Sequence, residues 1–327
     1  GQYGYTLKGI DEFHVAVSRF YSRRYGVHLD ANTEVVQLSG SQEGLAHLPL
    51  VFVNTGELIL LPDPCYPAYE TGVNLAQAEV YRMPLLKENN FLPDLKAIPK
   101  EVAKKAKMMF LNFPGNPIPA IPTKSFFEEV VHFAKANDLI VVHDFAYSEL
   151  NFSDEKPLSL LAIEGAKEVG VEFNSLSKSF NMAGCRIAYA VGNEKIVQAL
   201  SKLKSNLDFG VFMPIQRAAV KALNEGDLFL QELASIYKTR RDVFVDGLNN
   251  IGWQMDKPQA TMFIWAPIPE DMSSLQFTFE LMNKAGVVVT PGSAFGEYGE
   301  GYVRIGLVES ATNLEQVVQK IAEVKLF

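Results

Sequence analysis

Short runs of hydrophobic residues recur through the first two thirds of the chain. Residues 139–147 (LIVVHDFAY) are rich in β-branched side chains and too short for a typical helix, while residues 56–67 and 107–117 carry apolar runs that end in proline-containing turns. Residues 169–178 and 185–192 add two further runs of this kind. The pattern predicts β-strands in these five segments.

Segments with helical spacing alternate with these strands. Apolar residues recur every three or four positions from Ile10 to Tyr21, and Gly26 then ends the segment. Residues 122–138 form an amphipathic pattern in which Thr123 is placed to cap the helix. Strands that alternate with helices favour an α/β fold, with a mostly parallel sheet sandwiched between helices.

The pattern changes near residue 226. Residues 227–252 form one long helical segment, and the segments 260–268, 274–286 and 302–308 then predict a strand, a helix and a strand. We therefore expect a large domain over residues 1–225 and a smaller α+β domain over residues 226–327, in keeping with two domains for a chain of 327 residues.

Composition narrows the functional class. The net charge is −8, with 30 basic and 38 acidic side chains, so a nucleic-acid partner is not expected. The two cysteines, Cys65 and Cys185, suggest no disulfide framework and favour a reducing, cytoplasmic location. No apolar run is long enough to span a membrane, residues 1–10 do not resemble a signal peptide, and the histidines lack metal-ligand spacing, so we expect no membrane segment and no metal site.

Polar residues follow the predicted strands where each strand ends. In a mostly parallel sheet these ends lie at one edge, where ligands usually bind. The candidates are Asn112, Asn116, Asp144, Tyr147, Ser175, Ser177 and Lys178.

Two of these candidates suggest a particular cofactor. A carboxylate such as Asp144, desolvated at a strand end, stays ionised beside a cationic partner such as a protonated ring nitrogen. A buried lysine such as Lys178 loses its proton readily and condenses with aldehydes. Together these two requirements describe pyridoxal 5′-phosphate.

Other residues are suited to the cofactor's phosphate and ring. In the sequence LSGSQEG, Ser41 and Gln42 open an apolar helix whose free N–H groups would face an anion. Arg186 supplies a fixed cation, and Ser175 or Ser177 supplies a hydroxyl. Tyr66 is a candidate for stacking on the ring.

Each feature also has an ordinary structural interpretation. A lysine after a strand is usually exposed, an aspartate there is often a turn residue, and Ser-Gly pairs open many helices. We interpret the pairs Arg23–Arg24 and Arg240–Arg241 as solvated helix faces, and His143 as structural or as a neighbour that supports Asp144. The combined order and spacing of the candidates favours a site.

The chain resembles the fold-type I pyridoxal-phosphate aminotransferases of the aspartate aminotransferase superfamily, and within it bacterial enzymes of the LL-diaminopimelate aminotransferase type. The resemblance covers essentially the whole chain and is most specific in the run SLSKSFNMAGCR, residues 175–186. It implies a pyridoxal-phosphate-dependent transferase fold.

The resemblance also implies roles for individual residues. Lys178 would hold the cofactor as an internal aldimine and then move the substrate proton, and Asp144 would pair with the pyridinium nitrogen. Arg304 would bind the substrate α-carboxylate. The remaining implied contacts are Tyr147 and Asn116 on the phenolic oxygen, Tyr66 on the ring face, and Ser41, Gln42, Ser175 or Ser177, and Arg186 on the phosphate.

A two-fold homodimer with shared active sites is a further implication. Tyr5 resembles the tyrosine that reaches the phosphate in the neighbouring subunit, and family members carry a longer N-terminal arm before it.

The implied reaction is a ping-pong transfer of an amino group from an L-amino acid to a 2-oxo acid. Two alternatives use the same scaffold: a β-eliminating lyase, or a non-catalytic domain that binds an effector. A nicotinamide dehydrogenase is disfavoured because no G-x-G-x-x-G follows a strand.

Overall fold

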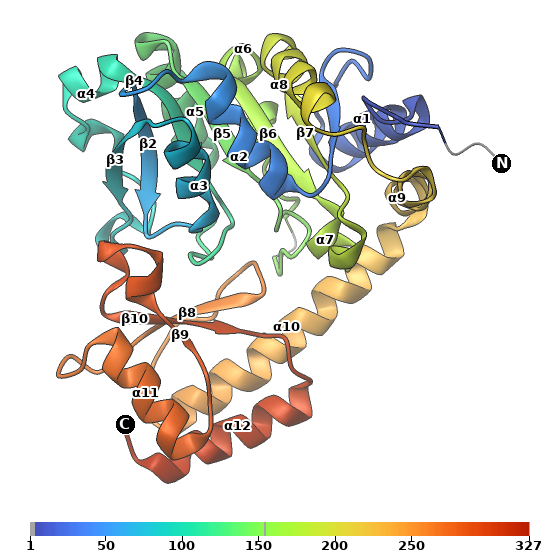
Figure 1. Cartoon of the computed structure of the whole chain (residues 1–327). Coiled ribbons are helices and arrows are strands. Elements are labelled where there is room, and N and C mark those ends of the chain that lie inside the picture. The colour runs from blue at the N-terminus through green and yellow to red at the C-terminus, as the bar shows by residue number, and fades with distance from the viewer. Residues whose placement is uncertain (1–3, 154, 327) are drawn as a thin grey trace.

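The computed structural model describes residues 4–153 and 155–326. It contains a seven-stranded and a three-stranded sheet, and the long helix α10 (Asp227–Asn250) runs from the level of the first to that of the second (Figure 1). The large sheet comprises β1 (Val35–Leu38), β2 (Leu58–Asp63), β3 (Glu79–Pro84), β4 (Ala106–Leu111), β5 (Ile140–Asp144), β6 (Gly170–Ser175) and β7 (Ala188–Gly192). The small sheet comprises β8 (Phe263–Pro267), β9 (Thr290–Pro291) and β10 (Tyr302–Gly306).

The large sheet is mostly parallel, as predicted. Its strand order is β1-β7-β6-β5-β4-β2-β3, and the five strands from β6 to β3 are parallel to one another. β7 pairs antiparallel with β6 and with β1. The five predicted strands are β2 and β4 to β7. β1 and β3 were not predicted, because β1 has only four residues and most side chains of the edge strand β3 are partly exposed.

The predicted helices are present at nearly the predicted bounds. Thr123 caps α5 (Lys124–Asn137), because its hydroxyl accepts a hydrogen bond from the Phe126 N–H at 3.2 Å. The helices besides α5 and α10 are α1 (Asp11–Tyr25), α2 (Ser41–Phe52), α3 (Ala68–Leu75), α4 (Lys100–Lys105), α6 (Ala166–Val169), α7 (Leu176–Ser179), α8 (Glu194–Leu207), α9 (Met213–Glu225), α11 (Ser274–Ala285) and α12 (Ala311–Val324).

Helices cover both faces of the large sheet, which explains why its strands read as continuous apolar runs. Met108 and Phe110 of β4 belong to the hydrophobic cluster that includes α2, α3 and α8, whereas Met109 and Leu111 belong to the cluster that includes α5. Each such side chain contributes roughly 1.5–3 kcal/mol on burial. The sheet is therefore a rigid platform whose strand ends hold polar side chains in fixed positions.

The three-stranded sheet has one face packed against α10, α11 and α12. Phe244, Leu248, Phe277 and Leu281 belong to this second core. Phe263 and Arg304 instead line a pocket together with residues of the large sheet. α9 ends at Glu225 and α10 begins at Asp227, but the division into domains at residue 225 stays a prediction.

Two predictions about surface arginines were wrong. Arg24 forms an ion pair with the buried Glu149 at 2.6 Å. Arg241 is buried and donates hydrogen bonds to Asp242 and to the carbonyl of Pro258. Adjacent arginines on a helix point in different directions, so a pair in the sequence does not define an exposed face. None of the helices over residues 4–153 and 155–326 is long and apolar enough to cross a membrane.

Candidate active site

All predicted site residues except Tyr5 line one cavity of about 330 Å³ at the carboxyl ends of β4, β5 and β6. This volume lies within the range of about 300–1,000 Å³ that is usual for small-molecule sites. In Figure 1, α7 lies on the side of the large sheet that faces the small one. The cavity is lined by Ser41, Gln42, Tyr66, Asn112, Asn116, Asp144, Ala146, Tyr147, Ser175, Ser177, Lys178, Ala183, Arg186, Phe263 and Arg304.

Lys178 is presented by the short helix that follows β6. The Ser175 hydroxyl caps this helix by accepting the Ser177 N–H at 3.1 Å, and the Asn174 side chain accepts the Ser175 N–H at 2.7 Å. Burial lowers the pKa of the Lys178 ammonium, and the positive charges of Arg186 and Arg304 lower it further. Among the described residues none forms a hydrogen bond or an ion pair with this ammonium. Lys178 is therefore a half-buried amine that loses its proton more readily than an exposed lysine does.

Asp144 is the last residue of β5 and is almost fully buried. The Tyr69 hydroxyl donates to its Oδ2 at 2.8 Å, and the Ala146 N–H donates to its Oδ1 at 3.3 Å. The Asn112 side chain donates to the Asp144 carbonyl at 2.7 Å and fixes the backbone. Burial raises the pKa of Asp144, although the Tyr69 and Ala146 hydrogen bonds and the nearby His143 oppose this shift. A cationic ligand group beside the carboxylate would relieve the cost of burial.

His143 is held inside the large sheet by two hydrogen-bonding contacts. It is fully buried and lies next to Asp144, with Nδ1 2.8 Å from Glu172 Oε2 and Nε2 2.9 Å from the carbonyl oxygen of Phe113. These contacts agree with the structural interpretation of His143, whereas its support of Asp144 stays a prediction.

An anion-binding corner lies at the start of α2. Gly40 precedes this helix with φ 87° and no side-chain cap, so the first N–H groups of the helix are left for another partner. A β-carbon at residue 40 would overlap the Arg186 guanidinium, which means that Arg186 lies directly against the Gly40 backbone. Tyr66 donates to Gln42 Oε1 at 3.4 Å. This corner combines a helix N-terminus, a guanidinium and the hydroxyls of Ser175 and Ser177.

Arg304 closes the cavity from β10 of the small sheet. Its Nη1 donates to Asn116 Oδ1 at 2.7 Å and its Nη2 donates to Thr290 Oγ1 at 3.2 Å. The guanidinium carbon lies 4.5 Å from the Phe263 ring centroid and 4.8 Å from that of Phe295. Burial lowers the pKa of Arg304. The Arg304 Nε is buried without a hydrogen-bond partner among the described residues, so the guanidinium is held in place with donor capacity left over.

Tyr147 and Tyr5 occupy different environments. Tyr147 is buried in the cavity wall, 5.6 Å from the Phe263 ring, and burial raises the pKa of its phenol. Tyr5 is 81% exposed, packs on Phe209 with ring centroids 4.8 Å apart, and does not line the cavity of its own chain. The predicted reach of Tyr5 into a partner subunit stays a prediction.

Two residues of the site were missed in the sequence. Tyr69 lies three positions after Tyr66 and points inward to Asp144, while Tyr66 lines the cavity. Phe263 lies in an apolar strand whose alternation gave no sign that one face meets a ligand. Across the described ranges, no group of three or more His, Cys, Asp or Glu side chains is placed to hold a metal ion.

Comparison with known proteins gives consistent matches. A family model described as aminotransferase class I and II matches residues 2–321. The chain is 46% identical over 319 residues to an LL-diaminopimelate aminotransferase from Moorella thermoacetica, a match that covers 98% of this chain and 82% of the relative. It is 48% identical over 313 residues to a protein of the same name from Desulforudis audaxviator, covering 96% of this chain and 80% of the relative.

Solved structures agree with these matches. The apo structure of BacF from Bacillus subtilis is 42% identical, with a TM-score of 0.96 over 99% of this chain and 87% of the other. The resemblance and the fold class stated from the sequence are thereby confirmed, and the effector-binding alternative loses its support. The chain is an enzyme of the class I and II aminotransferase family.

Proposed function

We propose that this aminotransferase binds pyridoxal 5′-phosphate in the cavity around Lys178 and moves an amino group from an L-amino acid to a 2-oxo acid. The observation that carries the proposal is the placement of Lys178, an amine with a lowered pKa, in the same cavity as the buried carboxylate of Asp144. When bound, the cofactor supplies an aldehyde that condenses with amines and a ring that delocalises negative charge from the substrate Cα.

The described residues fit this cofactor at each end. Lys178 would hold the aldehyde carbon. The Asp144 carboxylate would accept a hydrogen bond from the protonated ring nitrogen, and this cation would offset the cost of burying the carboxylate. Asn116, Tyr147 and Tyr66 all line the cavity. Asn116 and Tyr147 bind the phenolic oxygen, while Tyr66 covers the ring face. Ser41, Gln42, Ser175, Ser177 and Arg186 bind the phosphate, which suits the uncapped N-terminus of α2 and the guanidinium packed on Gly40.

Two residues of the chain, Arg304 and Lys178, would bind the substrate and move its proton. Arg304 binds the α-carboxylate through the donors of its planar guanidinium, which Phe263 and Phe295 support through their rings. Lys178 Nζ would take the proton from the substrate Cα, and its lowered pKa leaves more of the amine in the neutral form that acts as a base. Phe263 adds an apolar surface to a cavity that is otherwise lined mostly by polar side chains.

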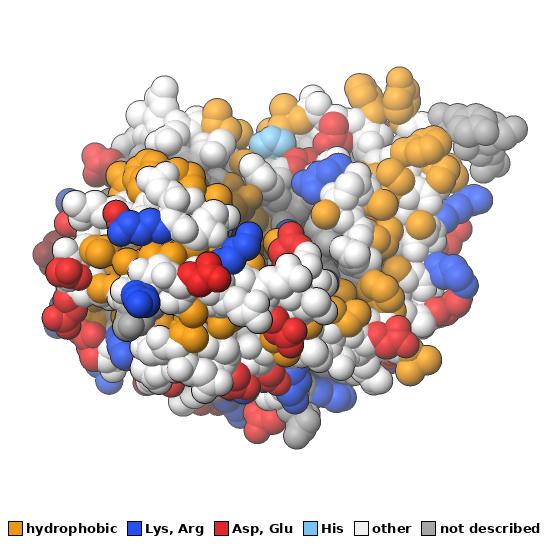
Figure 2. Space-filling view, turned by 90° about the horizontal axis from the view of Figure 1, so that it is seen from below, with side chains coloured by type: hydrophobic (Ala, Val, Ile, Leu, Met, Phe, Trp, Pro, Cys, Tyr) orange, Lys and Arg blue, Asp and Glu red, His pale blue; other side chains and the backbone are white. Residues whose placement is uncertain are grey.

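A homodimer is part of the proposal. Tyr5, Phe209 and Phe212 are large hydrophobic side chains that are more than half exposed. Figure 2 shows hydrophobic side chains gathered on the right-hand side of the face that it draws. A partner that covers this surface would bury Tyr5 beside a second active site. Sedimentation of the purified protein tests this point, and a monomer at micromolar concentration would contradict it.

The first substrate to test is LL-diaminopimelate, because the two relatives from Moorella and Desulforudis carry that name. The absorption spectrum of the protein with pyridoxal 5′-phosphate should change when LL-diaminopimelate is added and should recover with 2-oxoglutarate. The Lys178→Ala variant should show neither change. Release of ammonia without a 2-oxo acid acceptor would favour the β-eliminating alternative instead.

A further inference from the structure

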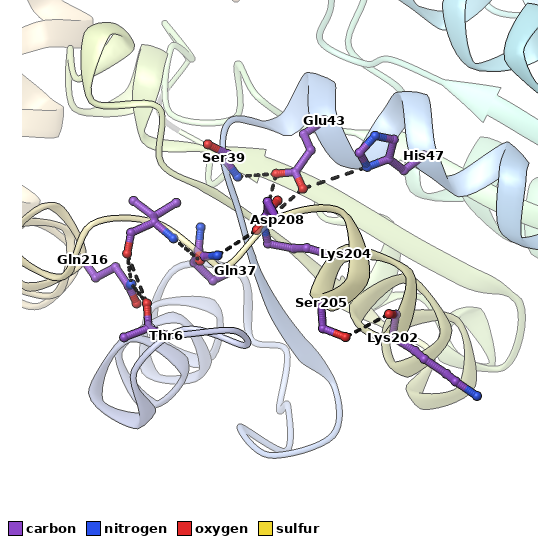
Figure 3. Close-up of polar contacts among 12 residues, drawn as sticks. Thr6, Gln37, Ser39, Glu43, His47, Lys202, Lys204, Ser205, Asp208 and Gln216 are labelled. Atoms are coloured by element: carbon purple, nitrogen blue, oxygen red, sulfur yellow. Dashed lines mark hydrogen bonds and ion pairs between the residues drawn. The ribbon is translucent and has the colours of Figure 1, made fainter. Parts of the chain in front are cut away.

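A group of charged side chains lies beside Ser39 and the first turn of α2 (Figure 3). Lys204 of α8 is fully buried, and its Nζ donates to Glu43 at 3.0 and 3.3 Å and to Asp208 Oδ2 at 2.6 Å. Lysines are almost never fully buried unless they are paired. Because burial of charges is costly, an apolar residue would pack α8 against α2 at lower cost, and packing alone does not account for this group.

Glu43 connects this group to the loop before α2. Its Oε2 accepts the Ser39 N–H at 2.5 Å, so the carboxylate reaches back from the third residue of the helix to the residue before Gly40. A glutamate at this helical position commonly fixes the entering chain in this way. Lys204 holds the Glu43 carboxylate in place, and the loop Ser39–Ser41 therefore depends on an ion pair that lies outside the cavity wall.

Asp208 connects the same lysine to the segment after α8. Its Oδ1 accepts the Gly210 N–H at 2.7 Å. The neighbouring Val211 N–H donates to Gln37 Oε1 at 3.4 Å, and Gln37 belongs to the strand that leads into Ser39. The loop is thus braced from the helix that follows it and from the strand that precedes it.

We infer that Lys204, Glu43 and Asp208 form a positioning cluster that holds the loop Ser39–Ser41 in the conformation that receives the phosphate of the cofactor. The inference rests on the proposed function. None of the three side chains lines the cavity, so the cluster acts through the loop backbone and through Gly40 packed on Arg186. We therefore expect the cluster to strengthen the binding of a ligand that carries a phosphate ester and not the binding of the same ligand without it.

The test compares binding of pyridoxal 5′-phosphate and of pyridoxal to the full chain, followed by the absorbance of the bound ligand. Lys204→Met removes the charge and keeps the volume. We expect it to weaken binding of the phosphate ester roughly tenfold or more, the effect of losing a charge-assisted hydrogen bond, and to leave pyridoxal binding unchanged. Lys202→Met is the matched control, because Lys202 is exposed on the same helix and points away from the cluster (Figure 3).

The outcomes separate this inference from the proposed function. Equal weakening for both ligands, or no weakening for either, would overturn the positioning cluster. A wild-type protein that binds neither ligand would instead overturn the proposed function. Glu43→Gln serves as the second variant if Lys204→Met does not fold, since it keeps the size of the side chain and removes the ion pair, and the same selective loss is expected.

Discussion

The Tyr69 hydroxyl lies 2.8 Å from Oδ2 of Asp144, and both side chains are buried. This hydrogen bond stabilises the ionised form of Asp144 and so opposes the rise in the pKa of Asp144 that burial causes. Tyr69 thus favours the charged form of the carboxylate that we propose pairs with the cofactor ring.

Tyr69→Phe should therefore raise the pKa of Asp144 further and weaken cofactor binding about tenfold, as expected for a lost hydrogen bond to a charged group. Titration of cofactor affinity against pH measures this effect. The loss should be largest at low pH, where the variant's Asp144 is already protonated, and should shrink as pH rises through that pKa. A loss that is independent of pH would show that Tyr69 acts only through packing.

Arg304→Lys tests the carboxylate fork. A lysine keeps the charge but not the planar pair of donors, so kcat/KM for the amino acid should fall by about 10- to 100-fold, with most of the change in KM. The absorbance of the bound cofactor should stay the same, because Arg304 contacts the substrate. A variant with an unchanged KM would remove Arg304 from the substrate site.

Gly40→Ala tests the anion corner and has a matched control. A β-carbon at Gly40 meets the Arg186 guanidinium, whereas one at Gly56, which also has positive φ, meets nothing within 4 Å. Both substitutions should cost about 1 kcal/mol or more of folding stability through backbone strain. Only Gly40→Ala should also weaken binding of pyridoxal 5′-phosphate. Equal binding by the two variants would place the phosphate elsewhere.

The titration of Lys178 is a fourth prediction. Its pKa should lie below the ordinary lysine value of about 10.4, so its neutral, reactive form should persist to lower pH than that of exposed lysines. NMR titration of the methylated amine in the cofactor-free protein would measure this. Removing one cation with Arg186→Leu should move the pKa upward, whereas a downward shift would contradict the proposed electrostatics.

Glu172 anchors a buried network behind the site. It accepts hydrogen bonds from Tyr21, Ser159 and the Leu160 N–H at 2.9–3.0 Å and contacts His143. Glu172→Leu should lower the free energy of unfolding by about 3 kcal/mol or more, because several buried polar groups lose their partner. Urea unfolding would measure the change. Tyr21→Phe, which removes one of these bonds, should cost about 1 kcal/mol, and an equal loss in both variants would argue against a shared network.

Much of the site was predictable because parallel strands place their carboxyl ends at one edge. Asp144 ends β5 and Ser175 ends β6, so recognising these apolar runs was sufficient to bring the two residues and Lys178 together. Ser41 and Gln42 were expected at a helix N-terminus, and they are the first two residues of α2. These residues occupy positions that local pattern and strand order define.

The residues that were not predictable depend on side-chain direction across long distances in the chain. Nothing in the segment DPCYPAY distinguishes Tyr66, which lines the cavity, from Tyr69, which points to Asp144. The buried state of Lys204 depends on Glu43, 161 positions earlier, and Arg24 is paired with Glu149, 125 positions later. These contacts exist only in the folded chain, where α8 packs on α2 and α1 lies near the end of β5, so the sequence alone does not reveal them.

Arg304 and Asn116 belong to segments of different sheets, and the bond between them has a consequence for selectivity. Nη1 carries two N–H donors, and Asn116 Oδ1 accepts one of them. On the proposed assignment, Asn116 therefore fixes the direction of the guanidinium and leaves the second donor for the substrate carboxylate. A ligand whose carboxylate does not meet this preset direction forms fewer hydrogen bonds, so the contact between segments of two sheets helps to select the substrate.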